Sequence, residues 1–389
     1  MRKSVILFLL FFQFFMSDGQ NVRIGILSEK IIKTLVFAPS EGIYQIVADS
    51  IQMEAFDKTL AVCIQVSNDS LMLKMSDGRA FTFSEITFMS GKSSYFRICI
   101  DGLNIKTYDD NLIVRNRFGS LLLINEVEMD DYLCGVIEKE TGKKKNKEFY
   151  KTQAILCRTY WAKARENHLV EGYQLCDGVH CQAFMGKPSD IPNIRKAVEE
   201  TYDLIITDTT GAPVTAVFHG NCGGITEGAE NVWVKSRPYL KPVHDEFCLS
   251  MPGAEWTKSL SLKEWREYLK NAGINNAIDC DPIVFNFLNN DRKTYYKVGG
   301  DSLTFVKMRN ELKLRSAFFL VRYENNQITL SGRGYGHGVG MCQEGAMNMA
   351  KQGYTYRQII AKYFTGVEIR TLTESDSLKN LYNETQFIH

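Results

Sequence analysis

The chain of 389 residues carries 46 basic and 45 acidic side chains, which gives a formal net charge of +1. Such balance provides no general attraction to nucleic acid or to anionic membranes, so we expect no nucleic-acid partner. A hydrophobic content of 44% and a charged content of 23% exclude global disorder. The length predicts two domains, or one domain with a large elaboration.

Residues 1–19 have the pattern of a signal peptide. Arg2 and Lys3 precede an apolar run from Val5 to Met16 that only Gln13 interrupts, and small residues follow around a cleavage point. The run is shorter than the roughly 20 apolar residues that span a bilayer, although an uncleaved anchor is the alternative. We therefore expect an exported protein, periplasmic or extracellular, with no transmembrane span in the mature chain.

The remaining sequence predicts an α+β fold with three parts. From residue 20 to about residue 119, short apolar runs alternate with Gly, Asp, Ser and Asn, which predicts an N-terminal β-rich accessory region. Residues 120–372 mix strand-like and helix-like segments and are predicted to form a mixed α/β core domain. An elaboration at about 246–327 is inserted in this core, and a polar tail occupies 373–389.

Two consecutive helices are predicted near the start of the core. The first has Asp130 or Asp131 as its N-cap and Glu140 near its end. The second covers residues 148–167, where apolar residues recur at helical spacing. Shorter helices are predicted around residues 194–201, 344–352 and 356–363.

Glycine occupies every second position around His337 in the segment GRGYGHGVGMCQEGA, residues 332–346. No G-x-G-x-x-G register and no βαβ pattern accompany it, so it is not a dinucleotide fingerprint. Two interpretations remain open. His337 is either a hydrogen-bonding residue in a tight strand-to-helix crossing or a residue that lines a site, with Gln343 and Glu344 extending the polar lining.

A second glycine-rich segment, FHGNCGGITEGAENVW, covers residues 218–233. Its polar residues suit the hydroxyl groups of a sugar, and Trp233 offers an aromatic face for stacking. A nucleophilic role for Cys222 is disfavoured because no third group that would orient a Cys–His pair is evident. The pairs Cys222 with Cys248 and Cys63 with Cys99 are candidate disulfides.

Two histidines and two cysteines lie close together in the sequence: His168, Cys176, His180 and Cys181. These four ligands are enough for a closed tetrahedral zinc site, which predicts a structural ion because no position is left for a water. A Cys176–Cys181 disulfide or two free thiols is the alternative. The sequence contains no H-E-x-x-H, no G-x-S-x-G and no phosphate-binding loop, which excludes the commonest metalloprotease, esterase and NTPase sites.

These segments, in this order, resemble the SpoIID/LytB family, named for stage II sporulation protein D. The resemblance begins with Tyr-Leu-x-Gly-Val-x-x-x-Glu, here Tyr132 to Glu140. An Arg-Thr-Tyr segment at 158–160, the Cys-Asp…His-Cys-Gln loop and the Cys-Gly-Gly turn follow. The glycine-rich segment around His337 comes last.

The resemblance implies a lytic transglycosylase, a lyase that cleaves the MurNAc-GlcNAc strands of peptidoglycan, with peptide-stripped strands as the expected substrate. It assigns Glu140 as the single catalytic residue; without it, Glu227 would be an equal candidate. To donate a proton near neutral pH, Glu140 needs partly apolar surroundings. From the matched motifs we expect the following substrate-binding residues: Arg158, Tyr160, Gly223, Gly224, Thr226, His337 and Gln343.

The resemblance also leaves an alternative, because some relatives are described as amidase enhancers. In that case the chain would be a non-catalytic glycan-binding partner of a cell-wall amidase. Departures from the family pattern are local: Thr141, Gly142 and a lysine run follow the glutamate, and Asn221 and Cys342 stand where serine is common. Neither Asn221 nor Cys342 removes an ionisable group from the chemistry that the resemblance implies.

Overall fold

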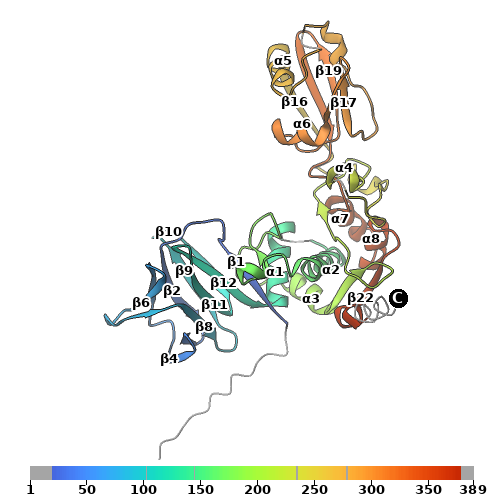
Figure 1. The fold of residues 1–389 in the computed structure, drawn as a ribbon. Helices are drawn as coiled ribbons and strands as arrows, with labels where there is room; N and C mark the ends of the chain where they lie inside the picture. The colour runs from blue at the N-terminus through green and yellow to red at the C-terminus, as the bar shows by residue number, and fades with distance from the viewer. Residues whose placement is uncertain (1–19, 102, 144, 234, 277–278, 378–389) are drawn as a thin grey trace, which may run out of the picture. The chain divides into compact units, whose positions relative to one another are not determined.

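The computed structural model describes residues 20–377 except 102, 144, 234, 277 and 278, and they form two compact units (Figure 1). Unit 1 contains residues up to 139 together with 164–189, and unit 2 contains 140–163 and the residues from 190 onward. The chain therefore passes between the units three times. The predicted signal peptide, 1–19, lies outside the described residues.

Unit 1 is built on two β-sheets, and among its described strands only β1 and β13 pair in parallel. The seven-stranded sheet has, in spatial order, β13 (Leu175–Cys176), β1 (Asn21–Ile26), β12 (Ser120–Glu128), β11 (Asn111–Arg117), β8 (Glu85–Ser90), β3 (Tyr44–Ala48) and β4 (Ile51–Phe56). The six-stranded sheet has β10 (Leu103–Asp109), β9 (Tyr95–Ile100), β2 (Thr34–Glu41), β5 (Val62–Ser67), β6 (Ser70–Met75) and β7 (Ala80–Phe83).

Aromatic side chains join the two sheets of unit 1. Phe37 on β2 stacks on Phe88 of β8, with ring centroids 3.9 Å apart, and meets the edge of Tyr44 on β3 at 5.1 Å. All three side chains are fully buried. The inner faces of the sheets thus share one hydrophobic core, and the predicted N-terminal β-rich region is confirmed.

The pairing of these strands excludes one of the candidate disulfides. Cys63 on β5 and Cys99 on β9 both lie opposite Val36, on either side of β2. Because neighbouring strands are about 4.8 Å apart, the two Cα atoms are separated by about 10 Å, and a disulfide needs less than about 7 Å. All ten cysteines are free thiols.

The two predicted helices at the start of the core are confirmed as α1 (Met129–Thr141) and α2 (Lys147–Ala164). The predicted N-cap was wrong, since α1 begins at Met129 and both Asp130 and Asp131 lie in its first turn. Acidic groups there interact favourably with the N-terminal end of the helix dipole.

Unit 2 contains α2 and most of the chain after residue 190. Its next elements are α3 (Pro192–Glu200), β14 (Leu204–Thr207), β15 (Phe218–His219), α4 (Glu230–Trp233) and η2 (Glu246–Cys248). After the predicted elaboration come β21 (Met341–Cys342), α7 (Gln343–Lys351), α8 (Tyr356–Tyr363) and β22 (Glu368–Thr371). Among the described residues, no helix has both the length and the apolar character needed to cross a bilayer.

A segment of unit 2 has a hydrophobic core of its own, which includes Trp265, Tyr296 and Phe305. The strands β16 (Glu255–Ser261), β20 (Gln327–Arg333) and β19 (Phe319–Glu324) form its main sheet. Its remaining elements are α5 (Leu262–Asn271), η3 (Pro282–Phe285), β17 (Tyr295–Val298), β18 (Asp301–Thr304) and α6 (Phe305–Glu311). Figure 1 draws these elements together in yellow and orange.

Two adjacent tyrosines on β17 provide a test of this core. Tyr296 is fully buried and donates a hydrogen bond to the Phe285 carbonyl at 2.9 Å, whereas Tyr295 is 49% exposed. We expect Tyr296→Ala to lower the free energy of unfolding by about 3–5 kcal/mol, and Tyr295→Ala to change it by less than about 0.5 kcal/mol. Urea denaturation of both variants measures the difference, and equal effects would contradict this core.

Candidate functional site

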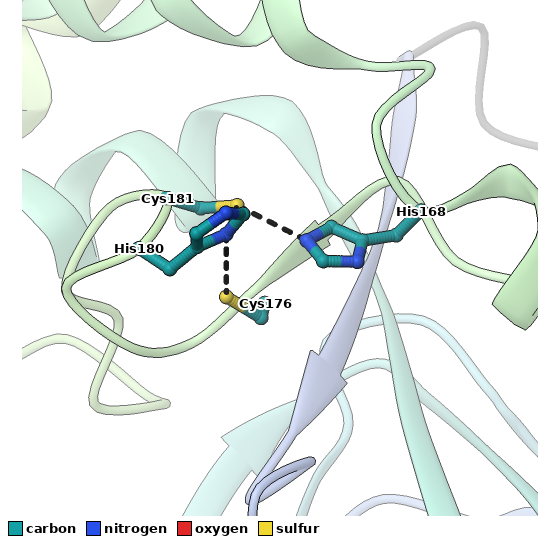
Figure 2. A group of neighbouring side chains, drawn as sticks. All are labelled: His168, Cys176, His180 and Cys181. Carbon is teal, nitrogen blue, oxygen red and sulfur yellow. Dashed lines mark hydrogen bonds between the residues drawn. The ribbon is translucent and has the colours of Figure 1, made fainter.

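The predicted metal ligands of unit 1 converge in the structure (Figure 2). The sulfur of Cys181 lies 3.5 Å from Nε2 of His168 and 3.5 Å from Nδ1 of His180, and the sulfur of Cys176 lies 3.9 Å from the same Nδ1. One donor atom from each residue lies within 4.8 Å of the other three. The two thiols are buried and His180 is exposed.

These distances fit a tetrahedral metal ion. Bonds of about 2.3 Å to sulfur and 2.0–2.1 Å to nitrogen would place neighbouring sulfur and nitrogen atoms about 3.5 Å apart. Metal-bound histidines usually have a carboxylate or carbonyl near their second ring nitrogen. Oε1 of Glu171 lies 3.6 Å from Nδ1 of His168, so this cluster could hold a metal such as zinc.

The loop that carries these ligands is fixed to the sheet and to α1. Asp177 accepts a hydrogen bond from the Leu27 amide at 3.0 Å, next to the short pairing of β13 with β1. Gln182 accepts one from the Tyr132 hydroxyl at 3.0 Å, and both residues are buried. These contacts of the loop that carries Cys176, His180 and Cys181 determine where α1 lies within unit 1.

Gly135 allows α1 to approach this loop closely. A Cβ atom at this position would lie 2.9 Å from the Gly186 carbonyl oxygen and 2.9 Å from the ring of Phe184. Any larger residue would push the helix away from the loop. The tyrosine and the glycine of the Tyr-Leu-x-Gly-Val segment therefore have a common structural role.

Two glutamates lie near the end of α1. Glu138 accepts hydrogen bonds from the amide and the hydroxyl of Ser189, at 2.6 and 2.7 Å. Glu140 is half-buried in the last turn of the helix. The two carboxyl groups point in different directions because their positions on the helix are about 200° apart.

The two glycine-rich segments lie side by side in unit 2. β15 pairs in parallel with β21, and isolated bridges join Asn221 to Tyr335 and Glu227 to Val339. Gly334 has a φ of +81°, and a Cβ atom on it would lie 2.5 Å from the Asn221 carbonyl oxygen. Alternating glycines thus allow two backbones to meet closely, a role that sequence patterning could not distinguish from contact with a ligand.

Both ring nitrogens of His337 form hydrogen bonds within the protein. Nδ1 accepts from the Val339 amide at 3.0 Å, so Nε2 carries the proton and donates to the Phe218 carbonyl at 2.9 Å. Burial lowers its pKa to about 4, which keeps the ring neutral. The ring of Trp233, which is 43% exposed, lies 4.9 Å away.

Two buried nitrogens next to this strand pair have no hydrogen-bond partner among the described residues. They are Nε2 of His219 and Nε2 of Gln343. His219 donates from Nδ1 to the Val339 carbonyl and burial lowers its pKa, so its Nε2 is an acceptor, whereas the Gln343 amide is a donor. Unpaired buried groups cost free energy, which a bound hydroxyl or water would offset.

Other predicted substrate-binding residues have contacts inside unit 2. Arg158 is 2% exposed and donates to the Thr201 and Leu204 carbonyls at 2.7 and 3.2 Å. Thr226 is 1% exposed, and its hydroxyl accepts from the Val243 amide. These contacts favour positioning roles. Gly223 and Gly224 form the Cys-Gly-Gly turn with positive φ, and Tyr160 is half-buried on α2.

Glu227, the other glutamate considered from sequence, is held by several partners. Its Oε1 accepts from the Gly228 amide and the Asn231 side chain, each at 2.9 Å, and its Oε2 lies 3.7 Å from the Arg292 guanidinium. These contacts suit a residue that fixes the loop. Sequence reasoning missed a buried cluster in the same unit: Cys222, Asp245, Cys248 and Cys342.

Comparison with known proteins relates this chain to one family. Residues 117–207 match the family model of SpoIID, stage II sporulation protein. The chain is 28% identical to stage II sporulation protein D of Bacillus subtilis over 274 residues, 67% of this chain and 78% of the relative. A protein of Brachyspira hyodysenteriae without an assigned function is 29% identical over 259 residues, 64% of this chain and 68% of the relative.

The amidase enhancer of Bacillus subtilis is 26% identical over 292 residues, 61% of this chain and 40% of the relative. The family match includes α1, α2 and the four clustered histidines and cysteines. Over this segment the chain is similar to the SpoIID family, which is associated with peptidoglycan remodelling.

Proposed function

We propose that the chain is a peptidoglycan lytic transglycosylase in which Glu140 is the catalytic acid and base. The observation that carries this proposal is the place of Glu140 at the end of the Tyr-Leu-x-Gly-Val-x-x-x-Glu segment, inside the matched residues 117–207. The tyrosine and the glycine of that segment anchor α1, which carries the half-buried Glu140 in its last turn.

A single carboxyl group is sufficient for this reaction. Hydrolytic glycosidases usually need two carboxyl groups, one of which protonates the leaving oxygen while the other activates water or attacks the sugar. In the transglycosylase reaction Glu140 donates its proton to the glycosidic oxygen as the bond to C1 breaks. The carboxylate then takes the proton of the muramic acid 6-hydroxyl, whose oxygen bonds to C1. Glu140 is protonated again at the end, and no water is consumed.

The histidine and cysteine cluster of unit 1 is proposed to hold a structural zinc ion. Four protein ligands leave no position for a reactive water, so zinc supplies folding energy and no catalytic step. His168, Cys176, His180 and Cys181 would hold it. The loop they form contacts α1 through Gln182 and Phe184, which supports a role in positioning the helix that bears Glu140.

Unit 2 is proposed to bind the glycan beside the paired glycine-rich segments. The exposed face of Trp233 suits stacking against a sugar ring. Gly223 and Gly224 let the turn pack against Arg333 and Leu249, and in this proposal they shape the backbone beside the glycan. In this proposal Arg158, Thr226 and His337 hold the surrounding backbone, and Tyr160 remains a candidate for direct contact.

The proposed substrate is found outside the cytoplasm, in the cell wall. The leader pattern of residues 1–19 supports export, and the relatives that carry names are two sporulation proteins and an amidase enhancer. Peptide-stripped strands are the proposed preferred form of the substrate.

Replacing the proposed catalytic carboxyl tests the reaction. We expect Glu140→Gln to lower the rate of strand cleavage about 10²- to 10⁴-fold, because an amide of nearly the same size can neither give nor take the proton. Formation of 1,6-anhydro ends from purified glycan strands, followed by mass spectrometry, measures this rate.

Glu138→Gln is the matched control. It makes the same change two residues away on α1, at a carboxyl group that binds Ser189. We expect it to retain the rate within a few-fold. Anhydro-ended products at an undiminished rate from Glu140→Gln would show that another group is the acid.

Removal of zinc tests the role of the cluster in unit 1. Elemental analysis of protein purified without added metal should find zinc, and Cys181→Ser should lose the zinc bound at this cluster. Chelation should lower the melting temperature, and the zinc-depleted protein should still cleave strands below that temperature, because the ion takes no part in the chemistry. A metal-free protein with Cys176 in a disulfide would contradict the assignment.

The similarity to an amidase enhancer favours a second candidate function, a glycan-binding partner of a cell-wall amidase. It differs from the first in one result. If wild-type protein binds purified strands but yields no anhydro ends, while a purified amidase acts faster in its presence, the binding function is correct and Glu140 is not catalytic.

A further inference from the structure

Three cysteines and an aspartate from distant parts of unit 2 converge in its interior. The sulfur of Cys222 lies 3.4 Å from that of Cys248 and 3.2 Å from Oδ2 of Asp245. With the sulfur of Cys342, the four donor atoms all lie within 4.8 Å of one another. Each of the four residues is fully buried.

This geometry matches a tetrahedral divalent ion of the zinc type. Zinc bonds of about 2.3 Å to sulfur and 2.0–2.2 Å to oxygen place neighbouring sulfur atoms about 3.8 Å apart and sulfur and oxygen about 3.5 Å apart. The observed separations are within a few tenths of an ångström of these values. Thiolates with one carboxylate are a donor set that zinc accepts.

The surroundings of the cluster stabilise negative charge on its ligands. The Cys342 sulfur accepts from the amides of Cys222 and Gly345, at 3.3 and 3.4 Å, and Cys342 is the N-cap of α7. The helix dipole at that end favours an anion. The Tyr363 hydroxyl donates to Oδ2 of Asp245 at 3.0 Å, which is the kind of outer contact that orients metal ligands.

A positive charge also lies near the cluster. The Arg292 guanidinium donates to the Cys222 carbonyl at 2.7 Å and is itself largely buried. Three thiolates, one carboxylate and a divalent ion carry a net charge of −2. The arginine, the backbone amides and the tyrosine together offset part of the cost of burying this charge.

A Cys222–Cys248 disulfide explains less of the arrangement. It would use two of the four residues and leave the Cys342 thiol and the Asp245 carboxyl buried beside it. The Asp245 carboxylate would then have only neutral hydrogen-bond donors, the Tyr363 hydroxyl and the Phe247 amide, to offset its burial, whereas a metal ion uses all four groups. The structure has both cysteines as free thiols.

We propose that Cys222, Asp245, Cys248 and Cys342 form a second metal site, which binds one zinc ion and is independent of the cluster in unit 1. Binding releases the three thiol protons to solvent and forms three bonds from sulfur and one from Oδ2 of Asp245. The Cys222 thiol hydrogen bond to that oxygen is replaced by the metal bonds. No oxidant or reductant is needed.

The proposed ion has a structural role in unit 2. It joins the Cys-Gly-Gly turn, the 3₁₀ helix η2 and the beginning of α7, which are distant in the sequence. Because β15 and β21 adjoin these ligands, the ion also fixes the paired glycine-rich segments. It would serve either of the two functions considered above, since it does not depend on the catalytic role of Glu140.

The test is the zinc content of four full-length proteins, isolated without added metal and dialysed against a chelator of moderate strength. Wild type should hold about two zinc ions per chain, and Cys342→Ser about one. Serine can still cap α7 through its hydroxyl, so this variant keeps the helix start while losing the thiolate. Cys176→Ser/Cys181→Ser, which removes the ligands of unit 1, should also hold about one.

Cys280→Ser is the matched control, because Cys280 lies in the same unit and outside the cluster. It should hold as much zinc as wild type. The same zinc content in Cys342→Ser as in wild type overturns the proposal, and so does the complete absence of zinc from Cys176→Ser/Cys181→Ser.

Two further measurements use protein in which Cys222, Cys248 and Cys342 are all intact. In the Cys176→Ser/Cys181→Ser protein, exchange of zinc for cobalt should give the intense absorption of a tetrahedral cobalt thiolate, and its absence counts against the site. Alkylation of denatured, unreduced wild-type protein should label Cys222, Cys248 and Cys342. A Cys222–Cys248 disulfide found by mass spectrometry would overturn the proposal.

Discussion

The contact between α1 and the loop of residues 176–186 is the constraint on which the account of unit 1 depends. Its two parts are the hydrogen bond from Tyr132 to Gln182 and the absence of a side chain at Gly135, where the helix meets Phe184 and Gly186. The loop can hold the helix in position only if the loop is itself rigid. The pairing of β13 with β1 and the hydrogen bond from the Leu27 amide to Asp177 fix this loop, which also carries three of the four clustered side chains that could hold a metal.

Much of the fold followed from local patterns in the sequence. The helices α2, α7 and α8 have apolar periodicity and lie within a few residues of their predicted bounds, and the β-rich start of the chain is confirmed. Strand partners were harder to predict. Cys63 and Cys99, for example, are separated by an intervening strand that only the sheet order reveals. Pairing between distant strands leaves little trace in one sequence.

In the candidate site, too, features set by local sequence could be predicted and features set by tertiary structure could not. The four ligands of unit 1 lie within a short segment and could be grouped from spacing alone, whereas Cys222, Asp245, Cys248 and Cys342 are brought together by tertiary structure. The roles of the motif residues were also hard to predict from the sequence. Arg158, Thr226 and His337 use their polar atoms to hold backbone, and a motif cannot separate that role from binding.

The central claim is that one carboxyl group cuts the strand without water, and isotope labelling tests it most directly. Peptide-stripped glycan strands would be digested with the wild-type protein in ¹⁸O-labelled water, and the new ends would be analysed by mass spectrometry. The account predicts 1,6-anhydro ends that carry no label, because the oxygen bonded to C1 comes from the sugar itself. Reducing ends that carry ¹⁸O would contradict it, since they require water as the nucleophile and a second catalytic group.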